Sequence, residues 1–158
     1  MELILQFLDI ILFLVLLMGG YFIGTIVEKR HYKSIYQREK ETLKMQVMTA
    51  EPKLPEERIR KVLLVSGNAV ISIDYFKRLL AQLRNVFGGR VKSYESLVDR
   101  ARREAILRMK DQARAAGARA VVNFRLETST IGRSANNKKT VGSVEAIAYG
   151  TAVVLHPK

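Results

Sequence analysis

The sequence contains no cysteine and no tryptophan, and its only histidines are His31 and His156. Without cysteine the chain cannot form a disulfide, a thiolate metal site or a cysteine nucleophile. Two histidines leave little material for an imidazole metal centre. Acidic residues are also scarce, since 15 Asp and Glu stand against 27 Lys and Arg and give a net charge of +12. This excess points to anionic partners such as lipid headgroups, nucleic acid or small anions.

Charge is also missing near the start of the chain, where no residue from Ile10 to Val27 is charged. At about 1.5 Å per residue this segment reaches roughly 27 Å, enough to cross the hydrocarbon layer of a bilayer. A secretory signal peptide is the alternative, but Glu2 stands where a basic region belongs and no small-residue cleavage site follows. Only Glu2 and Asp9 precede the segment, whereas bases follow from Lys29 onward. The positive-inside rule therefore predicts a single-pass inner-membrane protein, with its N-terminus outside and its C-terminal domain in the cytoplasm.

With 158 residues the chain has room for one domain and an appendage. We divide it into a transmembrane anchor at 1–27, a juxtamembrane helical stalk at 28–46 and a cytoplasmic domain at 47–158. The stalk has apolar residues at three- and four-residue spacings and no glycine or proline. Pro52 and Pro55 then break any helix and mark the start of the folded domain.

The domain shows the pattern strand, strand, helix, helix, strand, strand. The predicted segments are, in chain order, Met45–Ala50, Lys61–Ile73, Asp74–Phe87, Ser93–Gly117, Ala120–Glu127 and Val144–Val154. The class is therefore α+β, with a small, mostly antiparallel sheet covered by two helices.

Two of the predicted strands carry finer expectations. Lys61–Ile73 is apolar throughout, which predicts burial on both faces, with a bend or bulge at Gly67 and Asn68. In the later strand, Ala120, Val122, Phe124 and Leu126 alternate with polar residues and are expected to face the core. Small residues alternate along Val144–Val154, which would let a helix pack closely on a hairpin made by the last two strands.

Three stretches carry a family resemblance: RNVFGGRVKSYESL at 84–97, QARAAGARAVVNFRLETSTIG at 112–132 and VEAIAYGTAV at 144–153. They resemble the YbjQ-like family of uncharacterised bacterial proteins, whose domain is named for heavy-metal binding. The resemblance covers about Val47 to Val154. It implies a compact α+β subunit that assembles with itself into a ring, pentameric or a multiple of five. It brings no activity and no agreed ligand, and the anchor departs from the soluble members of the family.

The residue types favour neither a metal centre nor catalysis. We predict no metal residues and no cofactor, because soft metals need thiolate or imidazole ligands. Glu127 and Glu145 could hold a hard cation with Asn123, but a solvated face neutralised by Arg125 is the simpler interpretation. The sequence has no HExxH, P-loop, GxGxxG or catalytic-triad pattern, so the protein is predicted not to be an enzyme.

The most suggestive site lies where one predicted helix ends and the next begins. Gly88, Gly89 and Arg90 lead into Ser93, which can cap the second helix. Backbone N–H groups in a glycine turn, a guanidinium and a helix start together favour an anion. The alternative is that the glycines only end one helix, and that Arg90 pairs with an acidic residue.

The second helix carries a basic stripe made by Arg100, Arg103, Lys110 and Arg114. Nucleic acid or a lipid surface could bind it. However, Asp99, Glu104 and Asp111 are placed to pair with Arg103, Arg108 and Arg114 at helical spacing. We therefore interpret the stripe as a solvated face, with nucleic-acid or lipid-surface binding as the weaker alternative.

The leading functional hypothesis is a membrane-anchored domain that assembles with itself and acts as a scaffold or ligand-binding module. Its expected partners are other copies of the chain and the bilayer. The alternative is a small-anion or metal-responsive sensor with its site at the Gly88–Ser93 turn. The two differ in whether a small molecule occupies the assembled ring.

Overall fold

The computed structural model describes residues 2–50, 55–72, 92–131 and 143–156. Within these ranges the elements are, in chain order, α1 (Glu2–Glu41), β1 (Gln46–Val47), the 3-10 helix η1 (Glu56–Arg58), β2 (Ile59–Ser72), α3 (Lys92–Ala115), β3 (Ala120–Ile131) and β4 (Ser143–Leu155). The predicted helix Asp74–Phe87 lies outside the described residues.

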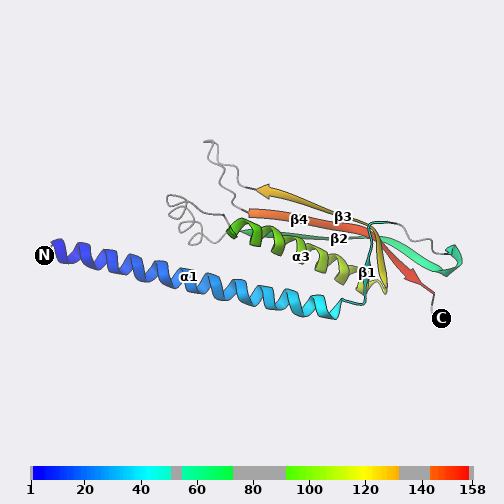
Figure 1. Ribbon diagram of the computed structural model, residues 1–158, viewed down its shortest axis with the longest axis horizontal. Helices are drawn as coiled ribbons and strands as arrows, with labels where there is room; N and C mark the ends of the chain where they lie inside the picture. The colour runs from blue at the N-terminus through cyan, green and yellow to red at the C-terminus, as the bar shows by residue number, and fades with distance from the viewer. Residues whose placement is uncertain (1, 51–54, 73–91, 132–142, 157–158) are drawn as a thin grey trace.

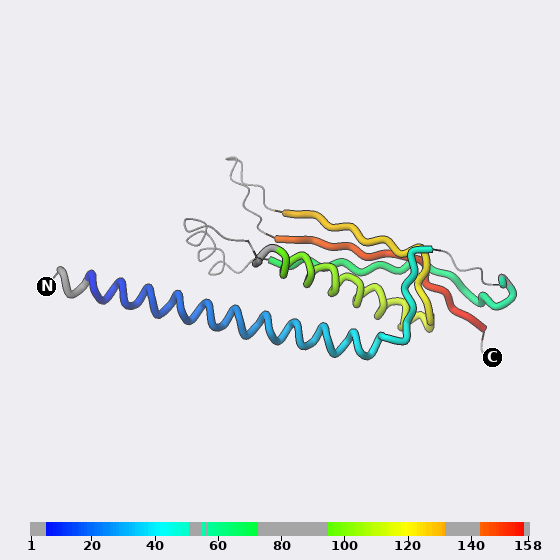
Figure 2. Tube along the Cα trace, in the orientation of Figure 1, coloured from blue at the N-terminus to red at the C-terminus, as the bar shows by residue number. Residues whose placement is uncertain are grey.

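The elements form three layers, with the sheet on one side, α3 in the middle and α1 on the far side of α3 (Figure 1). The strand order is β1-β3-β4-β2. β4 pairs antiparallel with both β2 and β3, whereas the short β1 pairs parallel with β3. The α+β class is therefore confirmed, and the sheet is mixed. Figure 2 shows that the first half of α1 projects beyond the sheet.

The core lies between α3 and the sheet and is built from small side chains. α3 contributes Ala101, Ala105, Met109 and Ala113, all fully buried. β4 contributes its predicted alternating set, which is Val144, Ala146, Ala148, Gly150, Ala152 and Val154. Small side chains on both layers let the helix approach the strands closely.

The prediction for β2 is wrong in two respects. Its side chains alternate between the core and solvent, so Val65 and Ala69 are buried while Leu64 is 74% exposed. The apolar sequence predicted burial on both faces, but α3 covers only one face within the described residues. No bulge occurs at Gly67, because β2 stays in register with β4 from Lys61 to Ser72.

A correction also applies to β3. The register with β4 shifts between Val122 and Arg125, and Asn123 within this shift has φ of 53°. An extra residue of this kind reverses the alternation of a strand. As a result Val121 joins the core ahead of the bulge, whereas Phe124 and Leu126 pack against the core as predicted.

The helices match their predicted spans closely. α1 continues without a break from the predicted anchor into the predicted stalk and ends at Glu41. α3 begins at Lys92, so Ser93 lies in its first turn. The helix ends at Ala115, two residues before the predicted Gly117, whose φ of 77° is typical of glycine beyond a helix C-terminus. Of the predicted strand Met45–Ala50, Gln46–Val47 forms β1 and pairs with β3, and the Met48 backbone bonds to Val121 and Phe124 of β3.

Candidate functional site

The second half of α1 docks along α3, and the two helices run parallel. Tyr32 donates its hydroxyl hydrogen to the Ser96 carbonyl at 3.3 Å. Ile35 is fully buried. One helical turn beyond Tyr32, the Tyr36 ring has the Arg103 guanidinium 4.4 Å from its centre. Residue numbers therefore rise together on both helices. We call this contact the α1–α3 seam.

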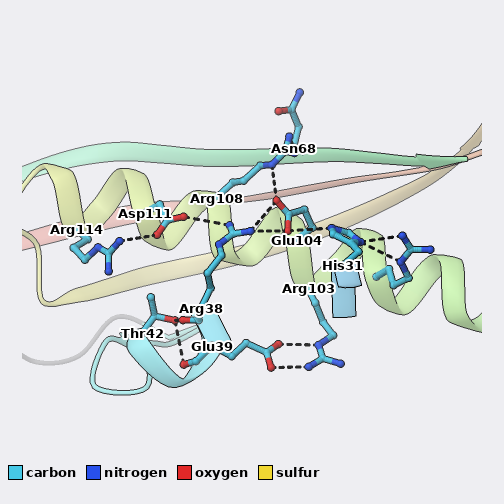
Figure 3. Close-up of polar contacts among 11 residues, drawn as sticks. His31, Arg38, Glu39, Thr42, Asn68, Arg103, Glu104, Arg108, Asp111 and Arg114 are labelled. Atoms are coloured by element: carbon cyan, nitrogen blue, oxygen red, sulfur yellow. Dashed lines mark hydrogen bonds and ion pairs between the residues drawn. The ribbon is translucent and has the colours of Figure 1, made fainter. Parts of the chain in front are cut away.

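Glu104 is the centre of the seam (Figure 3). It is only 5% exposed. Arg38 Nη1 donates to both of its carboxylate oxygens, at 3.2 and 2.9 Å, and Arg108 Nε donates at 2.9 Å. His31 Nε2 lies 3.7 Å from the same carboxylate. A buried carboxylate is tolerated where cations and hydrogen bonds compensate it, and here they come from both helices.

A second ion pair lies beside this centre. Arg103 binds Glu39 with two parallel hydrogen bonds, from Nε at 2.7 Å and from Nη2 at 2.6 Å. This two-bond geometry is the strongest form of an arginine–carboxylate contact. The hydrogen bonds from Arg103 lower the pKa of Glu39, and they also raise the pKa of Arg103. Both groups therefore stay charged under ordinary conditions.

Among the described residues of the seam, His31 is the only histidine. Arg100 donates to its Nδ1 from Nε at 3.2 Å and from Nη2 at 2.9 Å. An accepting Nδ1 places the ring proton on Nε2, toward Glu104. Burial and then the Arg100 cation lower the pKa of His31 below 6.5, and Glu104 opposes this shift without reversing it.

The structure confirms one part of the prediction for the α3 stripe and corrects another. The predicted pairs are present as Arg103–Asp99 at 3.5 Å, Arg108–Glu104 at 2.9 Å and Arg114–Asp111 at 3.3 Å. The stripe is not simply a solvated face, because Arg100 and Arg103 contact α1. Sequence reasoning missed Glu104 as the centre of the seam. The available signal was Arg38 beside Glu39 on the stalk, which offers one charge of each sign to α3.

The predicted anion site cannot be assembled from the described residues. Gly88, Gly89 and Arg90 lie outside them, and of Ser93 only the place in the first turn of α3 is described. The structure therefore leaves this site as a prediction.

The two carboxylates of the possible cation site on the last hairpin are not directly opposite each other. The register puts Glu145 opposite Ser129 and Glu127 opposite Ile147, while Asn123 lies within the β3 bulge. No group of three His, Cys, Asp or Glu side chains that could hold a metal occurs in the described ranges.

A second candidate surface is the face of the sheet that points away from α3, which we call the outer sheet face. Its exposed apolar residues are Val62, Leu64 and Val70 of β2, Ile131 of β3 and Ile147 of β4. Several large apolar residues together on one exposed face are typical of a protein contact surface.

Among the described residues β2 is an edge strand, and two backbone groups on its outer side bond to side chains of α3. Gln112 Oε1 accepts a hydrogen bond from the Ser66 backbone N–H, and Arg108 Nη1 donates to the Asn68 carbonyl at 2.8 Å. These contacts satisfy backbone groups that β4, on the other side of β2, does not reach.

Comparison with known proteins identifies the domain. A family model described as "Putative heavy-metal-binding", that of the YbjQ-like family, matches residues 45–156. A UPF0145 protein of Hahella chejuensis is 42% identical over 103 residues, which are 65% of this chain and 91% of that protein. A UPF0145 protein of Pyrococcus furiosus is 38% identical over 110 residues, 69% of this chain and 90% of its own length.

Among solved structures, a crystal structure of a protein of unknown function from Pediococcus pentosaceus aligns with a TM-score of 0.42 at 12% identity, covering 71% of this chain and 98% of that one. α1 lies wholly ahead of the region that the family model matches. Since that region spans more than two thirds of the sequence and the relatives match over most of their own length, the chain belongs to the YbjQ-like family.

Proposed function

We propose that this chain is a single-pass membrane protein whose YbjQ-like domain assembles into a ring on the cytoplasmic side. The ring would act as a scaffold or ligand-binding module and would catalyse no reaction. The observation that carries the proposal is the exposed apolar half of α1. It would be costly to leave in water and needs a bilayer or an equivalent apolar partner.

α1 divides into two halves with different surroundings. Its most apolar 18-residue stretch has a mean hydropathy of 2.5 and no buried residue. A core helix of a soluble protein would be covered, so this stretch favours lipid as its surroundings. The same unbroken helix then enters the seam with Ile35 and Arg38. This continuity favours a retained anchor over a cleaved signal peptide, which would not share a helix with the folded domain.

Lys29, Arg30 and Lys33 support a cytoplasmic domain, because basic residues flank membrane spans on the cytoplasmic side. Fusions at Lys158 test this orientation in a bacterial host. A green fluorescent protein fusion should be fluorescent in the membrane fraction, and an alkaline phosphatase fusion should be inactive. An active phosphatase would reverse the topology, and a fluorescent fusion in the soluble fraction would remove the anchor.

The outer sheet face supports self-assembly, since a second copy would cover its exposed apolar residues. Leu64 and Leu43 offer a matched test, because both are 74% exposed and only Leu64 lies on this face. In native mass spectrometry of the full chain from detergent, Leu64→Glu should lose the oligomer and Leu43→Glu should keep it. A parent protein that is monomeric would overturn the proposal.

The same spectrum separates the scaffold from the sensor. A small anion or metal retained by the parent oligomer would favour the sensor, whereas an unliganded oligomer would favour the scaffold. Binding of nucleic acid through the stripe is disfavoured because Arg103 and Arg114 are already paired with Glu39 and Asp111.

A further inference from the structure

We propose that the α1–α3 seam is a proton-sensitive helix contact: protonation of His31 expels Arg100 and shifts the seam toward an open form, in which α1 leaves α3 while the domain stays folded. Acidity would then decide whether the domain moves together with α1 or independently of it. The inference goes beyond the proposed function, and it holds whether or not lipid surrounds the first half of α1.

The closed seam requires an unprotonated Nδ1 on His31. Arg100 donates to this nitrogen from Nε at 3.2 Å and from Nη2 at 2.9 Å. A guanidinium has five N–H donors and no acceptor, so Nδ1 must offer its lone pair and carry no proton. Within the described ranges Arg100 makes no ion pair, and its other contact with α1 is the Tyr32 ring, whose centre lies 5.7 Å away. A proton on Nδ1 therefore removes both hydrogen bonds by which Arg100 holds α1.

The charges around His31 oppose that proton. Among the described residues, the charged groups that act on the ring are Arg100 and Glu104 of α3 and Arg38 of α1. Glu104 favours a protonated ring, but its carboxylate is already bonded twice by Arg38 and once by Arg108 (Figure 3). His31 Nε2 stays 3.7 Å away from it. Burial, Arg100 and Arg38 together lower the pKa of His31 below 6.5 in the closed seam.

The direction of the response follows from a comparison of the two forms. When α1 leaves α3, the His31 ring enters water and its pKa returns toward the ordinary value of about 6.5. The open form then binds the proton more tightly than the closed form does. A fall in pH below about 6.5 therefore shifts the equilibrium toward the open form, whereas at higher pH His31 is neutral in both forms and does not disturb the seam.

The seam can open without unfolding the domain, because the two are packed separately. Among the described residues of α1, only Ile35 and Thr42 are buried. The core cluster between α3 and the strands contains no residue from the described part of α1. The ion pairs that Arg38 and Glu39 make with α3 can exchange their partners for water when the helix leaves. Proton uptake at His31 thus acts on the seam and leaves the core in place.

Two spin labels placed across the seam would report whether it is closed. The chain has no cysteine, so Lys40→Cys on α1 and Ala115→Cys on α3, both at exposed positions, can be labelled selectively. The matched control combines Ala115→Cys with Ser66→Cys, a pair that joins α3 to β2 without crossing the seam. Pulsed electron paramagnetic resonance measures the distances at pH 7.5 and 5.5, where ordinary carboxylates stay charged. The full chain is studied in detergent and diluted with unlabelled protein, so that each distance lies within one molecule.

At pH 7.5 the seam pair should give one narrow distance distribution. At pH 5.5 a longer and broader component should appear. Its ratio to the closed form should rise by up to about tenfold for each pH unit that separates the pKa of His31 in the two forms. The control pair should not change. An unchanged seam pair would overturn the proposal, and so would a change in both pairs, because the domain itself would then be unfolding.

Two variants assign the response to His31. His31→Asn places a neutral amide oxygen near the position of Nδ1, where it can accept from Arg100 at any pH, so the narrow distance should persist at pH 5.5. Arg100→Gln removes the nearest opposing cation and should give a smaller response than the parent protein. If His31→Asn opened as the parent does, another group would be sensing pH and the proposal would fail. If His31→Asn did not close at pH 7.5, an undiminished response in Arg100→Gln would overturn the proposal and a reduced one would support it.

Discussion

Among single residues, Glu104 has the most demanding surroundings. Its carboxylate is buried between two helices and bonds to Arg38 and Arg108. In such a position the charge contributes little net stability while it is compensated, and it is costly when one partner is lost. The seam is therefore specific for opposite charges on α1 and α3.

Glu104→Gln keeps the shape of the side chain and removes its charge, which leaves Arg38 and Arg108 facing a neutral amide. We expect the free energy of unfolding to fall by about 2 kcal/mol. Asp99→Asn removes an exposed partner of Arg103 and should cost no more than about 0.5 kcal/mol. Urea denaturation of both variants in detergent measures the difference, and equal losses would contradict the central place of Glu104.

His31 should make stability depend on pH near neutrality. Its pKa is lower in the folded state than the ordinary 6.5, so the unfolded chain binds the proton first as the pH falls. Stability should therefore be full above about pH 6.5 and decrease below it, as protonation sets a cation beside Arg100 and Arg38. Thermal unfolding across this range should lose part of its pH dependence in His31→Asn. Identical profiles in the parent and His31→Asn would refute the effect.

At the scale of elements, the contact between α3 and β2 depends on Gly67. A Cβ at this position would meet the Ala105 carbonyl oxygen, the Met109 backbone nitrogen and Arg108 Cβ. Backbone atoms of a packed helix cannot yield as a flexible side chain does. The glycine therefore sets how closely α3 lies on the sheet.

Gly67→Ala should lower the free energy of unfolding by about 1–3 kcal/mol, because α3 must shift away from β2. Gly19→Ala is the matched control, since no atom lies within 4 Å of a Cβ placed there, and it should cause no loss. Calorimetry of both proteins would decide the point. A stable Gly67→Ala variant would mean that the helix can move at little cost.

The elements that follow local patterns were predictable, and those that depend on distant partners were not. The buried stripe of α3, its end at Gly117 and the small-residue face of β4 follow from periodicity and glycine chemistry. The exposure of Leu64 depends on which face α3 covers. The reversal in β3 depends on a bulge at Asn123. Of the candidate site, the pairs within α3 were predictable from spacing, whereas their pairing with Arg38 and Glu39 needs the tertiary docking of α1.

At the scale of the whole molecule, the seam bears on where a soluble fragment should begin. The family model starts at residue 45, yet Arg38, Glu39 and Ile35 belong to contacts with α3. A fragment of residues 28–158 keeps these contacts, whereas residues 45–158 lose them. The longer fragment should therefore melt higher, by roughly 5 °C or more. Equal melting temperatures would indicate that the docked half of α1 adds no stability.

The occupied edge of β2 limits how copies of the chain can associate. An open strand edge can recruit another strand, and repeated recruitment produces ribbons without a defined end. Here Arg108 and Gln112 hold the Asn68 carbonyl and the Ser66 N–H in the middle of that edge. Lateral growth by strand addition would have to break these bonds first. Within the described residues, the same two side chains that bind α3 to the sheet thus also hinder the strand-by-strand growth that leads to fibrils.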